Sequence, residues 1–127
     1  MSRTVTFSVV ALLLIAGCST TVAPEKVYGT YVADYPFGSA SLKLEHDGSF
    51  VQEVTIKDQQ PETVRGSWNF DPVRSEITLH GALAVADGYG HLSSDWHTAE
   101  DLIGQPVERL WFRVVIEISV DYPYVKQ

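Results

Sequence analysis

Short runs of alternating apolar and polar residues, separated by turn signals, constrain the fold of this chain more than any other feature. Ala40, Leu42 and Leu44 alternate with polar neighbours, and this period of two is typical of a half-buried β-strand. Asp47-Gly48 follows directly. This dipeptide between two alternating runs indicates a β-hairpin, because glycine tolerates a positive φ. The pattern therefore predicts antiparallel strands joined by tight turns.

The same pattern recurs along most of the chain after residue 26. Strands are predicted at 28–33, 40–44, 50–56, 64–70, 77–81, 109–118 and 121–126. The run 109–118, rich in β-branched and aromatic residues, is predicted to be a single long strand, and Pro123 confines the last strand to an edge or a ladder end. We expect an all-β fold, in which an antiparallel meander curls into a small barrel or sandwich, since a flat open sheet would leave exposed edges.

The stretch between the fifth and sixth predicted strands has little regular pattern. Residues 82–86 fit either a continued strand or a short helix, and the glycine-rich residues 87–95 predict a loop. Residues 96–103 predict a helical turn capped by Thr98, because acidic residues follow in its first turn.

The amino terminus has the layout of a secretory signal peptide, with Arg3 preceding a short apolar run, Val5–Ala16. That run is too short to cross a hydrocarbon core of about 30 Å as a helix. It ends in Leu-Ile-Ala-Gly-Cys at 14–18, which resembles the lipobox of bacterial lipoproteins. In that family the cysteine thiol is lipidated, and the chain is then cleaved before the cysteine.

The lipobox resemblance implies a division of the chain into three parts. Residues 1–17 would be a lipoprotein signal peptide, 18–26 an acylated tether beginning at Cys18, and 27–127 a single all-β domain. Each buried CH₂ of an acyl chain contributes about 0.8 kcal/mol, so more than one chain on Cys18 would hold the protein on its membrane. Ser19 follows the cysteine, whereas an aspartate there favours the inner membrane in Gram-negative lipoproteins. The resemblance therefore implies the outer membrane, at its periplasmic face or at the cell surface.

Net charge limits the classes of partner. The predicted leader contains one of the nine basic residues and none of the sixteen acidic ones, so the mature chain would carry a net charge of −8. This charge argues against binding to nucleic acid and against overall attraction to anionic lipid. The expected membrane contact is therefore through the acyl chains. The remaining candidate partners are an envelope protein and a small hydrophobic ligand.

Residues 28–81 also resemble the small lipocalin-like barrels of bacterial envelope lipoproteins, including the NlpE-type amino-terminal domains. The motifs that carry this resemblance are Gly29-Thr30-Tyr31, Leu42-Lys43-Leu44, Asp47-Gly48-Ser49-Phe50, Gly66-Ser67-Trp68 and Ile77-Thr78-Leu79. NlpE-type domains have a Cys-x-x-Cys near the first loop, where this chain has Tyr-Pro-Phe-Gly at 35–38. The resemblance therefore implies the architecture, and it does not extend to thiol redox or copper chemistry.

Aromatic residues on the predicted strands suggest a ligand site inside the barrel. Phe50, Trp68, Phe70 and Trp111 could line the interior and admit a small hydrophobic molecule, as in lipocalins. The competing interpretation is that they fill the interior, because a barrel of about eight strands is only just wide enough for its own side chains. The length of the chain favours the filled core.

The loop at 87–98 is the one place where polar residues suggest chemistry. His91, Asp95 and His97 could ligate a metal, or act with Ser93 or Ser94 in a hydrolase. Their spacing matches no ligand motif, and no nucleophile elbow presents a serine. We therefore predict no catalytic residue, no metal and no cofactor, and a lipid-anchored envelope protein with a binding or structural role. The alternatives are a lipocalin-like carrier and, third, a hydrolase or metal-binding protein that uses this loop.

Overall fold

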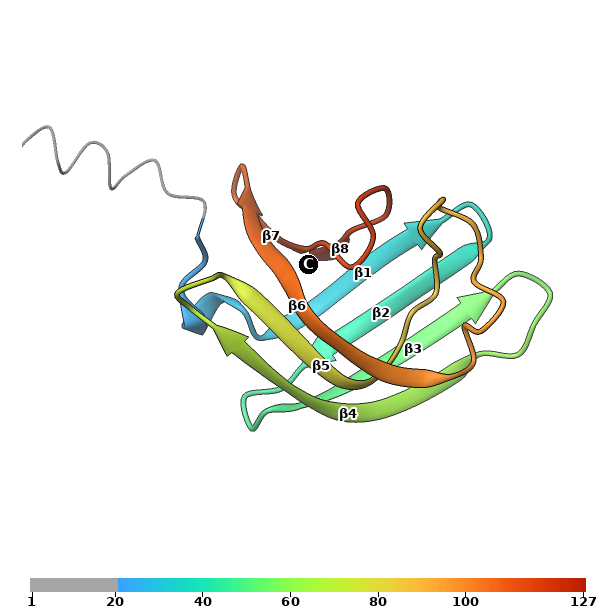
Figure 1. The fold of residues 1–127 in the computed structure, drawn as a ribbon, viewed down its shortest axis with the longest axis horizontal. Helices are drawn as coiled ribbons and strands as arrows, with labels where there is room; N and C mark the ends of the chain where they lie inside the picture. Colours follow the sequence, from blue (N-terminus) through green and yellow to red (C-terminus); the bar gives the residue numbers. More distant parts are fainter. Residues whose placement is uncertain (1–20) are drawn as a thin grey trace, which may run out of the picture.

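Eight antiparallel strands close into one barrel in the computed structural model, which describes residues 21–127 (Figure 1). Each strand pairs with its neighbour in the sequence, and the last pairs back onto the first. The predicted all-β fold is confirmed, and of the two predicted forms the barrel is the one found. A short 3-10 helix, η1 (Pro24–Lys26), precedes the strands, which are β1 (Gly29–Tyr35), β2 (Gly38–Leu44), β3 (Ser49–Ile56), β4 (Glu62–Asp71), β5 (Glu76–Leu83), β6 (Ala99–Leu110), β7 (Arg113–Ile116) and β8 (Tyr124–Lys126).

The alternation seen in the sequence decides which side chains enter the barrel. Ala40, Leu42 and Leu44 on β2 are buried, and the residues between them face outward or are only half-buried. The first five predicted strands all occur, with ends within two residues of those expected. Gly48 has a φ of 89° in the β2–β3 turn, which is the conformation that the Asp-Gly pair predicted.

Side chains fill the interior of the barrel. Phe50 from β3 is 1% exposed, and its ring lies over Gly66 of β4. A side chain at residue 66 would collide with this ring. Most of the fully buried side chains come from the strands, and one comes from the segment before β1. The largest of them are Val27, Tyr31, Leu42, Leu44, Phe50, Gln52, Val54, Ile77, Leu79, Leu83, Ile116 and Tyr124.

Gly66→Ala tests this packing. A Cβ at residue 66 would lie 2.0 Å from the carbonyl oxygen of His80 and 2.6 Å from the ring of Phe50, so the backbone of β5 must move to admit it. We expect a loss of about 2–3 kcal/mol in the free energy of unfolding, the upper range for overpacking. Gly88→Ala is the matched control, because a Cβ there meets nothing within 4 Å, and its cost should stay within about 0.5 kcal/mol. Equal urea midpoints for the two variants would contradict the packing described.

The predicted helical turn at 96–103 is wrong. Residues from Ala99 onward belong to β6, which pairs with β5 through an irregular register between Ile77 and Ala82. Leu102 is buried among the core residues on this strand. Pairing with β5 and burial of Leu102 therefore override the weak local capping pattern.

The predicted single strand at 109–118 is also wrong, because the chain reverses direction within it. Leu110 at the end of β6 pairs directly with Arg113 at the start of β7, which leaves Trp111 and Phe112 as a two-residue turn. Trp111 has a φ of 60°, a left-handed conformation that is uncommon for a bulky residue. We call residues 110–113 the hairpin tip.

The described part of the predicted tether packs against the barrel. The backbone N–H of Val22 donates to Ser75 Oγ over 3.4 Å, and Val22 is 5% exposed. Val27 is fully buried, and its carbonyl oxygen accepts a hydrogen bond from the Tyr31 hydroxyl. These contacts fix the point at which the chain enters the barrel. The predicted signal peptide at 1–17 and Cys18 lie outside the described residues.

Candidate functional site

The up-and-down order of the strands gives the barrel two distinct ends. We call one the amino-terminal end, because η1 lies there together with the β2–β3 turn, the β4–β5 turn and the hairpin tip (Figure 1). The opposite end carries the β1–β2 turn and the longer loops 57–61, 84–98 and 117–123. A ligand or membrane surface that contacts one end of the barrel therefore contacts only the loops at that end.

Large apolar side chains stand exposed at the amino-terminal end. Trp111 is 93% exposed and Phe112 is 86% exposed, both on the hairpin tip. Leu110 beside them is about half-exposed, and Val73 in the β4–β5 turn at the same end is also exposed. Their clustering at one end makes this a candidate contact surface, since isolated exposed apolar residues are ordinary but grouped ones mark binding sites.

The hairpin tip and the entering chain share a surface groove. It has a volume of about 480 Å³, and its lining residues are 21–23, Lys26, Arg109, Trp111, Phe112 and Val114. A second groove continues over the same end. Its lining residues are Lys26, Phe112, Arg113, Val114, Lys126 and Gln127. Basic side chains therefore border the exposed aromatic rings.

Lys126 ties this surface to the chain entry point. Its ammonium donates to the carbonyl oxygen of Lys26 over 2.6 Å and lies 5.9 Å from the centre of the Tyr28 ring. Partial burial, and after it the nearby charge of Lys26, lowers the pKa of Lys126. The last strand thus helps to hold η1 in place.

The four residues predicted to line an internal ligand site do not share one location. Phe50 is buried in the core, and Trp68 and Phe70 on β4 are half-buried against it. Trp111 lies outside the barrel on the hairpin tip, so its predicted place in the interior is wrong. The error follows from the strand prediction, since a continuous strand would have kept residue 111 within the barrel wall.

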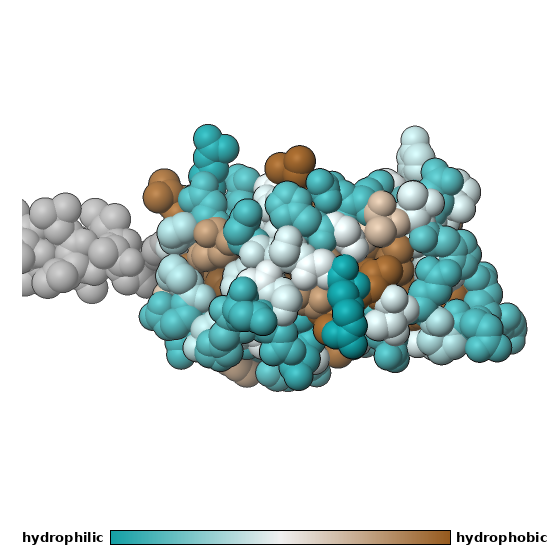
Figure 2. Space-filling view, turned by 90° about the horizontal axis from the view of Figure 1, so that it is seen from below, coloured by the Kyte–Doolittle hydropathy of each residue, from teal (hydrophilic) through white to brown (hydrophobic). Residues whose placement is uncertain are grey.

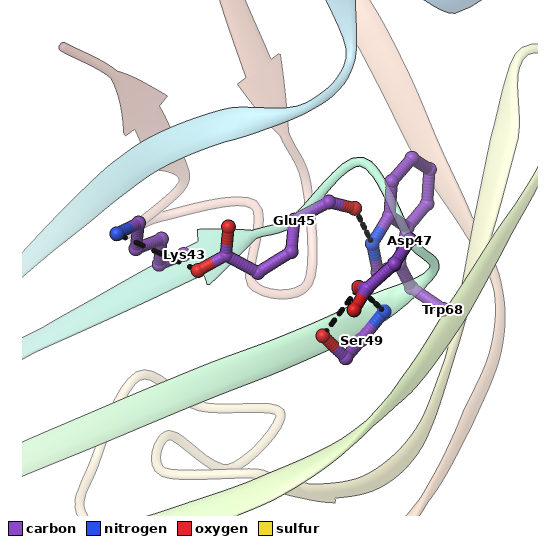
Figure 3. Close-up of polar contacts among 5 residues, drawn as sticks. All are labelled: Lys43, Glu45, Asp47, Ser49 and Trp68. Atoms are coloured by element: carbon purple, nitrogen blue, oxygen red, sulfur yellow. Dashed lines mark hydrogen bonds and ion pairs between the residues drawn. The ribbon is translucent and has the colours of Figure 1, made fainter.

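The groove beside the β2–β3 turn is lined by polar groups that bond to one another (Figure 3). Asp47 Oδ1 accepts hydrogen bonds from the backbone N–H of Ser49 at 2.9 Å and from its hydroxyl at 2.6 Å. These bonds hold the pKa of Asp47 below its usual value, with the hydroxyl contributing most. The indole N–H of Trp68 donates to the carbonyl oxygen of Glu45 over 3.0 Å. The arrangement stabilises a turn, and its hydrogen-bonding groups are used within the protein.

A buried polar cluster inside the barrel escaped the sequence analysis. Gln52 is fully buried, accepts a hydrogen bond from the Leu83 N–H at 2.7 Å, and donates to the Leu83 carbonyl oxygen at 3.0 Å. Its amide also donates to the Tyr124 hydroxyl at 3.0 Å. Tyr124 shares a further hydrogen bond with Tyr35, and burial is the main cause of the raised pKa of both phenols. One sequence feature indicates this cluster, namely a glutamine at an inward position between Phe50 and Val54.

The loop predicted to offer chemistry leaves its polar side chains at the surface. His91, Asp95 and His97 are exposed, and His97 Nδ1 contacts a carboxylate oxygen of Glu62 on β4. The residue that the loop buries is Trp96, which is 2% exposed and packs with the core. Across residues 21–127, no three His, Cys, Asp or Glu side chains are grouped closely enough to hold a metal ion.

Exposed apolar residues are spread over an otherwise largely hydrophilic surface. Seen from below, hydrophobic residues project near the end where η1 lies and near the middle of the molecule (Figure 2). At the opposite end Tyr89 and Val120 are also exposed. Among residues 21–127, no helix is long and apolar enough to cross a membrane. No known protein family, curated protein or solved structure matches the chain.

Proposed function

We propose that this chain is a lipid-anchored envelope protein in which a small closed barrel is held at the membrane surface and serves a binding or structural role. The proposed anchor is Cys18, acylated after the signal peptide at 1–17 is removed. The lipobox-like sequence before Cys18 supports this assignment. We further propose the outer membrane as its location, because Ser19 follows the cysteine.

The observation that carries the proposal is how firmly the chain is fixed just after Cys18. The Val22 N–H bonds to Ser75, and its side chain is buried on the barrel. Thr21 is three residues from Cys18, and an extended chain spans at most about 3.6 Å per residue, or roughly 11 Å here. An acyl group on Cys18 would therefore hold the amino-terminal end of the barrel close to the headgroups.

The rest of the barrel favours contact with other proteins as its role. The interior is occupied by large buried side chains such as Tyr31, Phe50 and Tyr124, which leaves the carrier alternative without a supporting observation. The loop residues considered for hydrolysis or metal binding are exposed, and His97 contacts Glu62 on β4, so that alternative has no supporting observation among residues 21–127 either. The end remote from the anchor carries exposed acidic residues, including Asp95 and Asp121, which would face an envelope partner.

Extraction of membranes tests the proposal. Membranes that contain the full-length protein are washed with high salt and then with alkaline carbonate. A protein held by buried acyl chains should remain in the pellet through both washes, because neither wash removes apolar chains from a bilayer. Release by salt would indicate an electrostatic contact, and release by carbonate would indicate a peripheral one. Either result would contradict the proposal.

A further inference from the structure

The hairpin tip combines exposure with an unfavourable backbone conformation. Trp111 is 93% exposed, Phe112 is 86% exposed, and Trp111 has a φ of 60°, where glycine, asparagine or aspartate is usual. A two-residue hairpin turn ordinarily uses those residues to match the twist of its strands. Large aromatic rings at this position weaken the turn and expose apolar area to water. Residues that depart from the usual turn preference and weaken the fold indicate a role other than stabilising it, such as binding.

The position of the hairpin tip indicates which kind of surface it contacts. Trp111 and Phe112 line the same groove as residues 21–23, and Cys18 is only three residues before that segment. With roughly 11 Å of chain available between Cys18 and Thr21, a lipid-anchored barrel must hold this groove at the bilayer surface. Trp side chains favour the membrane–water interface, since the ring is apolar and its N–H is polar.

We propose that the hairpin tip inserts into the headgroup region of the bilayer that carries the acyl chains of Cys18. Trp111 and Phe112 enter the boundary between headgroups and acyl chains, and Val73 in the β4–β5 turn lies at the same end of the barrel. Lys26 and Arg113, which border Phe112 in the second groove, lie at the level of the lipid phosphates. The barrel thus stands on its amino-terminal end, with loops 84–98 and 117–123 directed away from the membrane. This inference rests on the proposed lipid anchor.

Tryptophan fluorescence of the full-length acylated protein in phosphatidylcholine vesicles tests the contact. Lipids brominated in the acyl chains quench only tryptophans that reach them. Trp96 is buried and Trp68 is half-buried in the protein, whereas Trp111 is exposed. Because Trp111 is one of three tryptophans, we expect brominated vesicles to remove about a third of the emission of the wild-type protein.

Two variants at residue 111 assign the quenching. Trp111→Gly suits a φ of 60°, so it should fold at least as stably as the wild type and lose the quenching. Trp111→Asn also tolerates this conformation and should behave in the same way. A matched control adds Tyr89→Trp to Trp111→Gly. Tyr89 is 86% exposed in the loop at the opposite end, so the new tryptophan should remain unquenched.

Several results would overturn the contact. One is equal quenching of the wild type and Trp111→Gly, and another is quenching of the tryptophan at residue 89. A third is a concentration-dependent shift of Trp111 emission in detergent without lipid, which would place a second copy of the chain on the hairpin tip. The mass of Cys18 is measured on the same samples. An acylated protein without quenching overturns only this inference, whereas a protein without acyl mass overturns the anchor itself.

Discussion

Replacing Cys18 by serine is expected to abolish the carbonate-resistant attachment of the protein to membranes. A serine hydroxyl cannot accept the thioether-linked lipid that the lipobox resemblance implies, and cleavage before residue 18 follows lipidation in that family. The leader that remains has an apolar run of twelve residues, Val5–Ala16, which is shorter than the roughly 20 needed to span a bilayer. We therefore expect the resistant fraction to fall about tenfold or more, because stable anchoring takes more than one buried chain.

A neighbouring substitution controls for changes to the processing region. Ser19→Ala alters the second residue of the proposed mature chain and leaves Cys18 in place, so this variant should stay in the carbonate-resistant pellet. The hairpin tip alone offers a small apolar surface, and one such contact is too weak to replace the acyl chains. A Cys18→Ser protein that resists carbonate as strongly as the wild type would remove the basis of the proposed function.

Gln52→Leu is expected to cause a large loss of stability. Leucine fills a similar space but removes the partners of the Leu83 N–H and carbonyl oxygen, both of which face Gln52 inside the barrel. Leaving a buried backbone group unpaired costs about 1–3 kcal/mol, so the two together cost about 4 kcal/mol. Because small domains are stable by about 5–15 kcal/mol, much of the total would be lost.

Thermal unfolding followed by circular dichroism measures this loss. A change of 1 kcal/mol shifts the midpoint of a domain of this size by about 4–8 °C, so the expected fall exceeds about 15 °C. Gln59→Leu is the matched control, since Gln59 is exposed in the β3–β4 loop, and its effect should stay within about 0.5 kcal/mol. Similar midpoints for the two variants would show that the Gln52 hydrogen bonds contribute little.

The sequence was sufficient to predict the first half of the barrel because its strands are built from local rules. The alternation in β2 and the Asp47-Gly48 turn act within a few residues, and pairing with β3 follows from them. The same rules failed at β6, where residues 96–103 have a capping pattern but those from Ala99 onward pair with β5. The pairing of β5 with β6, across the loop 84–98, cannot be recognised from the few residues on either side of a position.

The candidate contact surface could not be predicted for a more specific reason. The turn at Trp111 and Phe112 contains none of the glycine, asparagine, aspartate or proline residues that identify turns, so residues 109–118 read as one strand. Gln52 was not predicted as a core residue because glutamine is mostly exposed in proteins, although residue 52 is an inward position of β3. Both exceptions lie where the chain departs from the average preferences of its elements, and such departures are common at functional or strained positions.

The mass of the intact protein purified from membranes tests the lipid anchor most directly. We expect a chain that begins at Cys18, lacks residues 1–17, and carries the additional mass of more than one acyl chain on that residue. Fragmentation should place all of the added mass on Cys18. A chain that retains its leader, or one cut elsewhere with an unmodified thiol at Cys18, would contradict the anchor and the membrane contact inferred from it.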